Sequence, residues 1–148
     1  MNNKNIPILP LTEPADYLEA LDLLAELGGS PRTIPEETIR TNFALCRQQG
    51  HAFFQARDGR KLVGIINIFP MINALSLTTW RINGLVVDKA YRKAGIGRHL
   101  MQACENHARA QGGKTMLLGV LTDNEQANTF YETIGYKVSA RQFSKSLA

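Results

Sequence analysis

Several basic side chains and two closely spaced glycines occur together in the stretch from Leu85 to Leu100, with the sequence LVVDKAYRKAGIGRHL. An apolar segment precedes the turn and apolar residues at every fourth position follow it, which predicts a strand, a turn and a helix in that order. The first N–H groups of a helix have no partner within it and carry the positive end of its dipole, so they bind phosphate readily. Gly95 and Gly97 would let the main chain approach such a ligand closely, since neither has a Cβ atom. Three basic side chains next to the glycines, Arg92, Lys93 and Arg98, would add full positive charge.

Two common phosphate-binding motifs do not describe this turn. The dinucleotide-binding pattern G-x-G-x-x-G fails because Leu100 stands at the third glycine position, and no acidic residue lies at positions 115–120 to hold a ribose. The pattern G-x-x-x-x-G-K-[ST] does not occur in the chain. What remains is R-x-x-G-x-G, directly after a Leu-Val-Val-Asp segment.

These residues carry a resemblance to the GNAT superfamily of N-acetyltransferases. Residues 87–97 match the family's pyrophosphate loop, V-x-x-x-x-[RQ]-x-x-G-x-[GA], at every specified position. A second segment, residues 124–136, resembles the family's later pattern N-x-x-A-x-x-x-Y-x-x-x-G-[FY]. The resemblance is dense over residues 61–147 and looser in the N-terminal third. Two motifs in the expected order are much more specific than either motif alone.

The resemblance implies that the chain binds acetyl-CoA or another acyl-CoA and transfers the acyl group directly to an amine. The pyrophosphate would lie on the amides of Ala94–Arg98, and the pantetheine arm would pair with the main chain of Leu85–Val87 like an added strand. Tyr131 would be the general acid that protonates the leaving sulfur, and the Val86 N–H would donate to the developing oxyanion. No metal is implied. The implied cofactor-binding residues are Leu85, Val86, Val87, Arg92, Lys93, Ala94, Gly95, Ile96, Gly97, Arg98, Asn124, Asn128 and Tyr131.

The general base departs from the family pattern. Many similar proteins carry a glutamate two residues before the position of Leu85, whereas this chain has Asn83 there. An amide side chain cannot accept the proton that the amine must lose. An ordered water, Asp88 or His51 could take the proton, or the acceptor amine could have a pKa low enough to need no base.

The elements around these motifs predict an α/β fold in the order β-α-α-β-β-β-α-β-α-β. We expect a short edge strand over 6–11, a helix from Asp16 to Gly28, and a second helix that opens at Pro35. Strands are expected over 51–57, 61–69, 77–87, 115–121 and 136–143, and helices over 96–111 and 124–133. The strand over 115–121 is apolar enough to be covered on both faces, and the run from Leu62 to Phe69 is interrupted by Gly64 and Asn67.

A GNAT-like arrangement of these elements is a single domain over residues 1–148. Its mixed central sheet has helices on both faces and a V-shaped splay between the strand over 77–87 and the strand after it. The resemblance further implies that the first two helices and their loop, residues 28–43, wall the acceptor site.

Composition narrows the class of protein. With 148 residues, 44% hydrophobic and 20% charged, the chain fits one globular domain. Its two cysteines have no metal-binding spacing, and no apolar run is long enough to span a bilayer. The first ten residues lack the pattern of a secretory signal, so a cytoplasmic protein is expected. Many similar proteins are dimers, which suggests a possible homodimer.

Three function classes remain in view. The leading hypothesis is acetyl transfer to a small-molecule amine, and acetyl transfer to a protein N-terminus or lysine is an alternative within the same chemistry. A non-catalytic acyl-CoA binding or sensing domain is a second class, kept open by Asn83. The net charge of +4 raises a nucleic-acid binder as a third class. Aromatic residues make up only 7% of the chain, however, and no helix-turn-helix, RNP-like aromatic pair or zinc knuckle occurs in the sequence.

Overall fold

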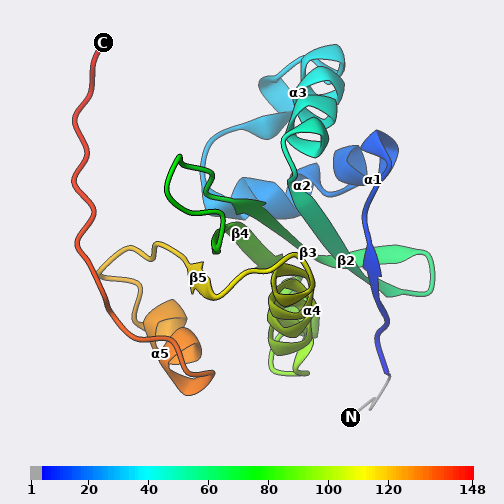
Figure 1. The fold of residues 1–148 in the computed structure, drawn as a ribbon. Coiled ribbons are helices and arrows are strands. Elements are labelled where there is room, and N and C mark those ends of the chain that lie inside the picture. Colours follow the sequence, from blue (N-terminus) through cyan, green and yellow to red (C-terminus); the bar gives the residue numbers. More distant parts are fainter. Residues whose placement is uncertain (1–4) are drawn as a thin grey trace. The chain divides into compact units, whose positions relative to one another are not determined.

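A computed structural model describes residues 5–148 of the chain (Figure 1). Its residues form two compact units, a larger one that ends at Leu117 and a smaller one from Leu118 to Ala148. The larger unit contains the sheet, the N-terminal helices and the turn that the sequence singles out. The smaller unit contains the second motif.

The larger unit is built on a five-stranded mixed sheet in the order β1-β2-β3-β4-β5. The pairs β1–β2, β2–β3 and β3–β4 are antiparallel, and β5 pairs parallel to β4. The sheet therefore confirms the predicted mixed topology. The strands predicted over 51–57 and 61–69 form a hairpin that turns at Gly59, whose φ is 59°. The strands are β1 (Ile8–Pro10), β2 (Ala52–Asp58), β3 (Lys61–Pro70), β4 (Thr79–Val87) and β5 (Thr115–Leu117).

The helical region before β2 is more broken than its apolar spacing predicts. The prediction of a single helix from Asp16 to Gly28 is wrong. The first helix ends in a tight turn, in which the amide of Ala20 donates to the carbonyl of Tyr17. The segments are α1 (Pro14–Glu19), α2 (Leu21–Leu24), the 3-10 helices η1 (Ala25–Leu27) and η2 (Pro31–Thr33), and α3 (Glu36–Gln48). The opening of α3 directly after Pro35 agrees with the sequence, because proline is tolerated where the first amides are unpaired.

The N-terminal helices pack on one face of the sheet through an apolar cluster. Phe43 of α3 lies 4.8 Å from Phe53 of β2 between ring centroids, and Tyr17 of α1 lies 5.4 Å from Phe43. The buried members of this cluster are Leu11, Ala20, Phe43, Phe53, Leu62, Ile65 and Val86. Aromatic burial of this kind is a main source of the free energy that holds the helices on the sheet.

The opposite face of the sheet carries α4 (Ile96–Ala110), as Figure 1 shows. Gly64 of β3 makes a close approach possible: a Cβ there would lie 3.1 Å from Leu100 Cδ1 and 3.3 Å from Ile96 Cγ2. Helices thus cover both faces, which confirms the predicted α/β architecture. The close contact at Gly64 fixes the first turns of α4, and with them the turn that leads into the helix.

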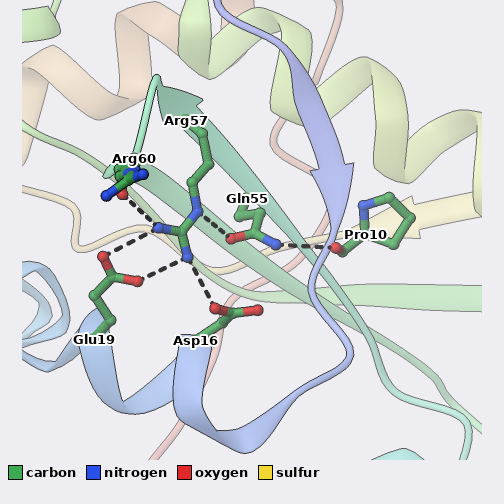
Figure 2. Close-up of polar contacts among 6 residues, drawn as sticks. All are labelled: Pro10, Asp16, Glu19, Gln55, Arg57 and Arg60. Atoms are coloured by element: carbon green, nitrogen blue, oxygen red, sulfur yellow. Dashed lines mark hydrogen bonds and ion pairs between the residues drawn. The ribbon is translucent and has the colours of Figure 1, made fainter.

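An ion-pair network joins the helix layer to β2 (Figure 2). The Arg57 guanidinium contacts Asp16 at 3.0 Å and Glu19 at 2.7 Å, and donates through Nε to Gln55 Oε1 at 2.8 Å. The buried Gln55 in turn donates to the carbonyl of Pro10 in β1. Because the Arg57 side chain is only 15% exposed, these contacts are shielded from water more than ordinary surface pairs.

The smaller unit differs from its prediction after its helix. Its helix α5 (Glu125–Thr133) begins directly after Asn124 as expected, and Gly135 follows it with φ 101°. The strand predicted over 136–143 is wrong, since residues 118–148 contain no strand. A strand is held by hydrogen bonds to a neighbouring strand, and Val138 and Phe143 are 82% and 88% exposed here.

The strand over 115–121 is also shorter than predicted. Its assigned part, β5, ends at Leu117, and its residues are exposed or half-buried rather than covered on both faces. Apolar composition alone does not distinguish a covered strand from an edge strand of the sheet, and β5 stands at the edge, with β4 as its single strand neighbour among residues 5–148.

Candidate functional site

The turn between β4 and α4 is anchored to the hairpin beside it. Asp88 follows β4 directly and caps the 3-10 helix η3 (Lys89–Tyr91) by accepting from the Ala90 amide at 2.9 Å. The Tyr91 hydroxyl donates to Asp58 Oδ2 at 2.6 Å, and Lys61 lies 3.5 Å from Asp88. These contacts hold the first half of the turn before the glycines begin.

The second half of the turn leaves its amides open. Lys93 has φ 67° and Gly95 φ 83°, so the chain curls through two left-handed residues just before α4 begins at Ile96. Within residues 5–148, the amides of residues 93–98 have no hydrogen-bond acceptor. The turn is exposed except at Ile96 and Gly97, of which Ile96 is buried. Consecutive unpaired amides at the start of a fifteen-residue helix, called the amide cradle below, are able to bind an anion.

The three basic residues of the turn are not equivalent. Arg92 is engaged within the protein: its Nε donates to the Val87 carbonyl at 3.1 Å, and its Nη2 pairs with Glu26 of η1 at 2.5 Å. Lys93 and Arg98 are exposed and form no ion pair with the part of the chain that the structure describes. Two full positive charges therefore remain for a ligand, and Arg92 fastens the end of β4 to the N-terminal helices.

The edge of β4 that faces away from β3 is open beside this turn. On one side Leu85, Val86 and Val87 pair with β3. On the other side the pairing with β5 ends at Arg81↔Leu117, so residues 82–87 have no strand partner there among the described residues. An extended ligand could hydrogen-bond to this edge like an added strand, as the predicted V-shaped splay requires.

A bulge interrupts β4 just before that open edge. Asn67 of β3 is paired with Gly84, and Ile68 is paired with Ile82, which leaves Asn83 as the extra residue. Bulges re-aim side chains and are frequent next to active sites. Here Asn83 and Gly84 both border a small hollow on the side of the N-terminal helices, together with Tyr17, Leu24, Leu27, Ile65, Ile66 and Asn67.

The candidate bases differ in how they relate to this hollow. His51 lies within hydrogen-bonding distance of Asn67, at 3.4 Å from Nδ1 to Oδ1, and Asn67 Oδ1 accepts from Asn83 Nδ2 at 3.3 Å. Burial lowers the pKa of His51, although the hydrogen bond to Asn67 opposes that shift, so the ring is neutral near pH 7. Asp88 is occupied by its cap and by Lys61, whereas His51 reaches the hollow only through two asparagines.

The smaller unit holds the residues of the second motif. Asn124 Oδ1 accepts from the Ala127 amide at 3.1 Å, so Asn124 is the N-cap of α5. Asn128 Nδ2 donates to the carbonyls of Leu121 and Asn124 at 3.2 and 2.7 Å. Both side chains thus shape the loop that enters α5.

Tyr131 lies on α5 and is half-buried. Its ring lies 5.1 Å from Phe130 and 6.0 Å from Tyr136 between centroids. Burial raises the pKa of its phenol above the ordinary value of 10.0. The hydroxyl therefore stays protonated across the neutral range, as a general acid must.

Two contributors to this region were not predicted. Asn67 interrupts an otherwise apolar strand, and that interruption is visible in the sequence, but its connection to Asn83 depends on the bulge. Glu26, the partner of Arg92, lies 66 positions earlier in the chain. Nothing in the sequence pairs these two residues.

The family model described as the Acetyltransferase (GNAT) family matches residues 17–136 of this chain. Because that match spans most of the sequence, the chain belongs to the GNAT acetyltransferase family, and the predicted resemblance is confirmed.

Similar proteins with curated descriptions are N-acetyltransferases. Glucosamine 6-phosphate N-acetyltransferase of Trypanosoma brucei brucei is 29% identical over 146 residues, covering 94% of this chain and 95% of the relative. N-alpha-acetyltransferase RimI of Mycobacterium tuberculosis is 33% identical over 82 residues, which is 55% of this chain and 49% of RimI. Human N-acetyltransferase 8 is 27% identical over 65% of this chain, but only 43% of its own length is matched. The chain therefore spans less than half of the length of some of these relatives.

Solved structures support the same fold. A Trypanosoma brucei acetyltransferase superposes with a TM-score of 0.83 at 22% identity, covering 97% of this chain and 100% of the other. AAC(6')-Iy, in complex with the bisubstrate analogue CoA-S-monomethyl-acetylneamine, reaches a TM-score of 0.83 at 14% identity, covering 98% and 99% of the two chains. At these identities the likeness shows the fold.

Neither a metal-binding cluster nor a membrane-spanning helix occurs in the described part of the chain. Within residues 5–148, no group of three or more His, Cys, Asp or Glu side chains lies close enough together to hold a metal ion. None of the described helices is both long and apolar enough to cross a bilayer.

Proposed function

We propose that this chain transfers the acetyl group of acetyl-CoA directly to the primary amine of a small molecule. The observation that carries the proposal is the cradle of unpaired amides at residues 93–98, next to an open edge of β4. Family membership gives this geometry its chemical meaning, since acetyl-CoA has both a pyrophosphate and an extended arm. The same assignment treats residues 1–148 as one acetyltransferase domain.

The cofactor-binding roles divide by chemistry. The amides of Ala94–Arg98 would hold the pyrophosphate, with the exposed charges of Lys93 and Arg98 beside it. The main chain of Leu85–Val87 would pair with the pantetheine arm. Arg92 contributes by holding the turn through Val87 and Glu26, and Asn124 and Asn128 would contribute by shaping the loop before α5.

The reaction requires a donor to the oxyanion, an acid for the departing sulfur and a way to remove the proton of the amine. The Val86 N–H would donate to the acetyl oxygen as negative charge develops there. Tyr131, whose buried phenol remains protonated, would give its proton to the departing sulfur. Asn83 cannot accept a proton, so water would remove the proton of the amine, or the acceptor would arrive with a lowered pKa.

The cysteines support direct transfer. A covalent route needs a thiolate in an exposed, electropositive setting. Cys104 is buried and Cys46 is half-buried, and burial raises the pKa of both thiols. Neither is suited to carry the acetyl group between the two substrates.

The relatives and the hollow beside Asn83 support a small-molecule acceptor. The relative matched over nearly its full length is named for glucosamine 6-phosphate, and a structural neighbour is an aminoglycoside acetyltransferase. The amino group of a small molecule would enter the hollow lined by Tyr17, Leu24 and Leu27. RimI, named as an N-alpha-acetyltransferase, supports a protein N-terminus as the second candidate acceptor. A cytoplasmic location and a homodimer stay predictions from the sequence.

An acetyl-transfer assay tests the proposal. Purified protein and acetyl-CoA are incubated with glucosamine 6-phosphate, sisomicin or a short peptide with a free N-terminus, and released thiol and acetylated product are both quantified. Acetylation of an amino sugar at rates well above the peptide supports the small-molecule assignment. Preference for the peptide favours the alternative, whereas acetyl-CoA binding without transfer to any amine would indicate a sensing domain.

A further inference from the structure

We infer that Asn67 is a positioning residue that fixes the side-chain amide of Asn83, so that Asn83 Oδ1 accepts a hydrogen bond from the amine of the acceptor. The inference rests on the proposed function, because it assumes that an amine enters the hollow beside β4. It adds a specificity-determining pair to that function, and neither residue takes the proton.

The bulge in β4 brings the two side chains together. In a regular strand Asn83 and Gly84 would point to opposite faces of the sheet. Because Asn83 is the extra residue between the pairs Asn67↔Gly84 and Ile68↔Ile82, it shares the face of Gly84 instead. Both residues border the hollow that Leu27 also lines, and a Cβ on Gly84 would lie 2.9 Å from Leu27 Cδ1.

The main chain determines which way the amide of Asn67 is turned. Its Nδ2 donates to the carbonyl of Ala52 at 3.1 Å and to that of Ile68 at 3.2 Å. An amide nitrogen has two hydrogens, and these two acceptors use both. Rotating the amide by 180° would place an oxygen against two carbonyl oxygens, so Oδ1 of Asn67 must face its other neighbours as an acceptor.

The orientation of the Asn67 amide determines the orientation of the Asn83 amide. An oxygen acceptor on Asn67 requires a donor from Asn83, and the contact observed is Nδ2 of Asn83 to Oδ1 of Asn67 at 3.3 Å. Asn83 Oδ1 is thereby left as a free acceptor, without a partner among residues 5–148. Since Asn83 is exposed and borders the hollow, this oxygen is available to a ligand there.

His51 supports the same arrangement from the other side. Its Nδ1 lies 3.4 Å from Asn67 Oδ1 and 3.3 Å from Asn67 Nδ2. Because both hydrogens of Nδ2 are used by the carbonyls of Ala52 and Ile68, the tautomer with a hydrogen on Nδ1 lets the ring donate to the same oxygen as Asn83. The ring also stacks on Phe69 at 4.9 Å between centroids, which holds it in place. In that tautomer, two donors on Oδ1 and two acceptors on Nδ2 saturate the Asn67 amide.

The chemical consequence is selection for a hydrogen-bond donor. A carbonyl oxygen accepts from an ammonium or amine N–H and repels the oxygen of a carboxylate or phosphate. A glutamate at this position would both accept the hydrogen bond and remove the proton. Asn83 keeps the first task and gives up the second, so it orients the amine and leaves deprotonation to water.

The test measures amine binding in the complex with CoA, where no transfer can occur. Wild type, Asn83→Ala, Asn67→Ala and the double variant are saturated with CoA and titrated by calorimetry with glucosamine 6-phosphate, sisomicin and the peptide. We expect each single variant to raise the amine Kd by about tenfold, and the double variant to be no weaker than Asn83→Ala, because both changes remove one interaction. The Kd for CoA should stay within about twofold of wild type in all of them.

Controls separate positioning from damage to the fold. Asn106→Ala removes an exposed asparagine from α4, far along the helix from the turn, and should leave the amine Kd unchanged. If Asn67→Ala does not fold, Asn67→Ser replaces it, since a serine is too short to reach both carbonyls and Asn83. Melting temperatures are recorded for every variant.

Several outcomes would overturn the inference. These are an amine Kd unchanged in Asn83→Ala, effects of the two single variants that multiply in the double variant, or no amine bound by the wild-type complex with CoA. The proposed function is judged separately by turnover. If the wild type turns over and Asn83→Ala leaves the amine Kd unchanged, the proposed function stands and the role of Asn67 and Asn83 is wrong. If amine binding depends on Asn83 but no turnover occurs, the role of the two asparagines stands and the proposed function is wrong.

Discussion

Two regions along β4 and its exit, ten residues apart, present different kinds of chemistry. The turn at residues 93–98 offers main-chain amides, and its side chains contribute only added charge. The hollow at Asn83 offers a side-chain amide whose orientation depends on a second asparagine and a bulge. The first region is built from backbone and the second from side chains.

The difference shows how substitutions in such a chain can change the acceptor that is bound while the cofactor stays the same. A site of main-chain amides needs left-handed residues and a helix start, and it tolerates substitutions that preserve them. A site of side chains changes with each substitution. We therefore expect the cofactor side to be hard to damage by truncation, and the acceptor side to be easy to alter.

The largest expected effect separates chemistry from binding. Tyr131→Phe removes the proposed acid and should lower kcat by roughly 10²- to 10³-fold, with the Kd for acetyl-CoA unchanged. Because burial raises the pKa of Tyr131, wild-type kcat should show no loss from its ionisation across the neutral range. Steady-state kinetics from pH 6 to pH 10 measure both. Tyr136→Phe is the control on the same unit, and an equal loss in both variants would remove the acid role from Tyr131.

The next largest effect is expected on the Kd for acetyl-CoA, when a side chain is added to the amide cradle. Gly97→Asp places a carboxylate at the start of α4, where it should repel the pyrophosphate and raise the Kd for acetyl-CoA roughly 100-fold. The same charge favours the helix N-terminus, so the melting temperature should not fall. Gln102→Glu adds equal charge at an exposed position further along α4. Calorimetry that finds Gly97→Asp and Gln102→Glu alike would contradict the anion site.

A third prediction concerns stability apart from either site. Arg57→Ala removes the contacts to Asp16, Glu19 and Gln55 and should lower the free energy of unfolding by about 2 kcal/mol. Denaturant titration measures this change. Arg60→Ala is the control, because Arg60 takes part through its carbonyl, which the substitution keeps. Equal stability of the two variants would mean that the network in Figure 2 contributes nothing measurable.

The smallest expected effect concerns Glu26, which connects the turn at residues 93–98 to the hollow at Asn83. Glu26 lies on η1 next to Leu27, which lines the hollow, yet it pairs with Arg92 of the turn. Glu26→Gln removes a negative charge near the phosphate site and should tighten acetyl-CoA binding by about two- to threefold at low salt. The gain should shrink as salt is raised. Weaker binding in this variant would show that Glu26 positions Arg92 for the ligand rather than competing with it.

Local signals predict much of this structure. The apolar spacing of 96–110 and the glycines before it predict α4 and the turn, and Asp58-Gly59 predicts the β2–β3 hairpin. These features depend on residues that are close in sequence. The N-cap at Asn124 belongs to the same class.

The features that escaped prediction depend on distant contacts. The Asn67–Asn83 bond needs a one-residue bulge, and the Arg92–Glu26 pair joins residues 66 positions apart. The break at Ala20 and the short β5 reflect packing that overrides periodicity. The strand expected over 136–143 rests on composition and resemblance, neither of which specifies a neighbouring strand for it.

The measurement that tests the central claim most directly is calorimetric titration of the protein with acetyl-CoA, with pantetheine lacking the phosphates as the comparison ligand. Our account predicts micromolar binding of acetyl-CoA and at least tenfold weaker binding of pantetheine, because the amides of residues 93–98 hold the pyrophosphate. Equal affinity for the two ligands would contradict the assignment of this turn. Absence of acetyl-CoA binding would contradict the proposed function as well.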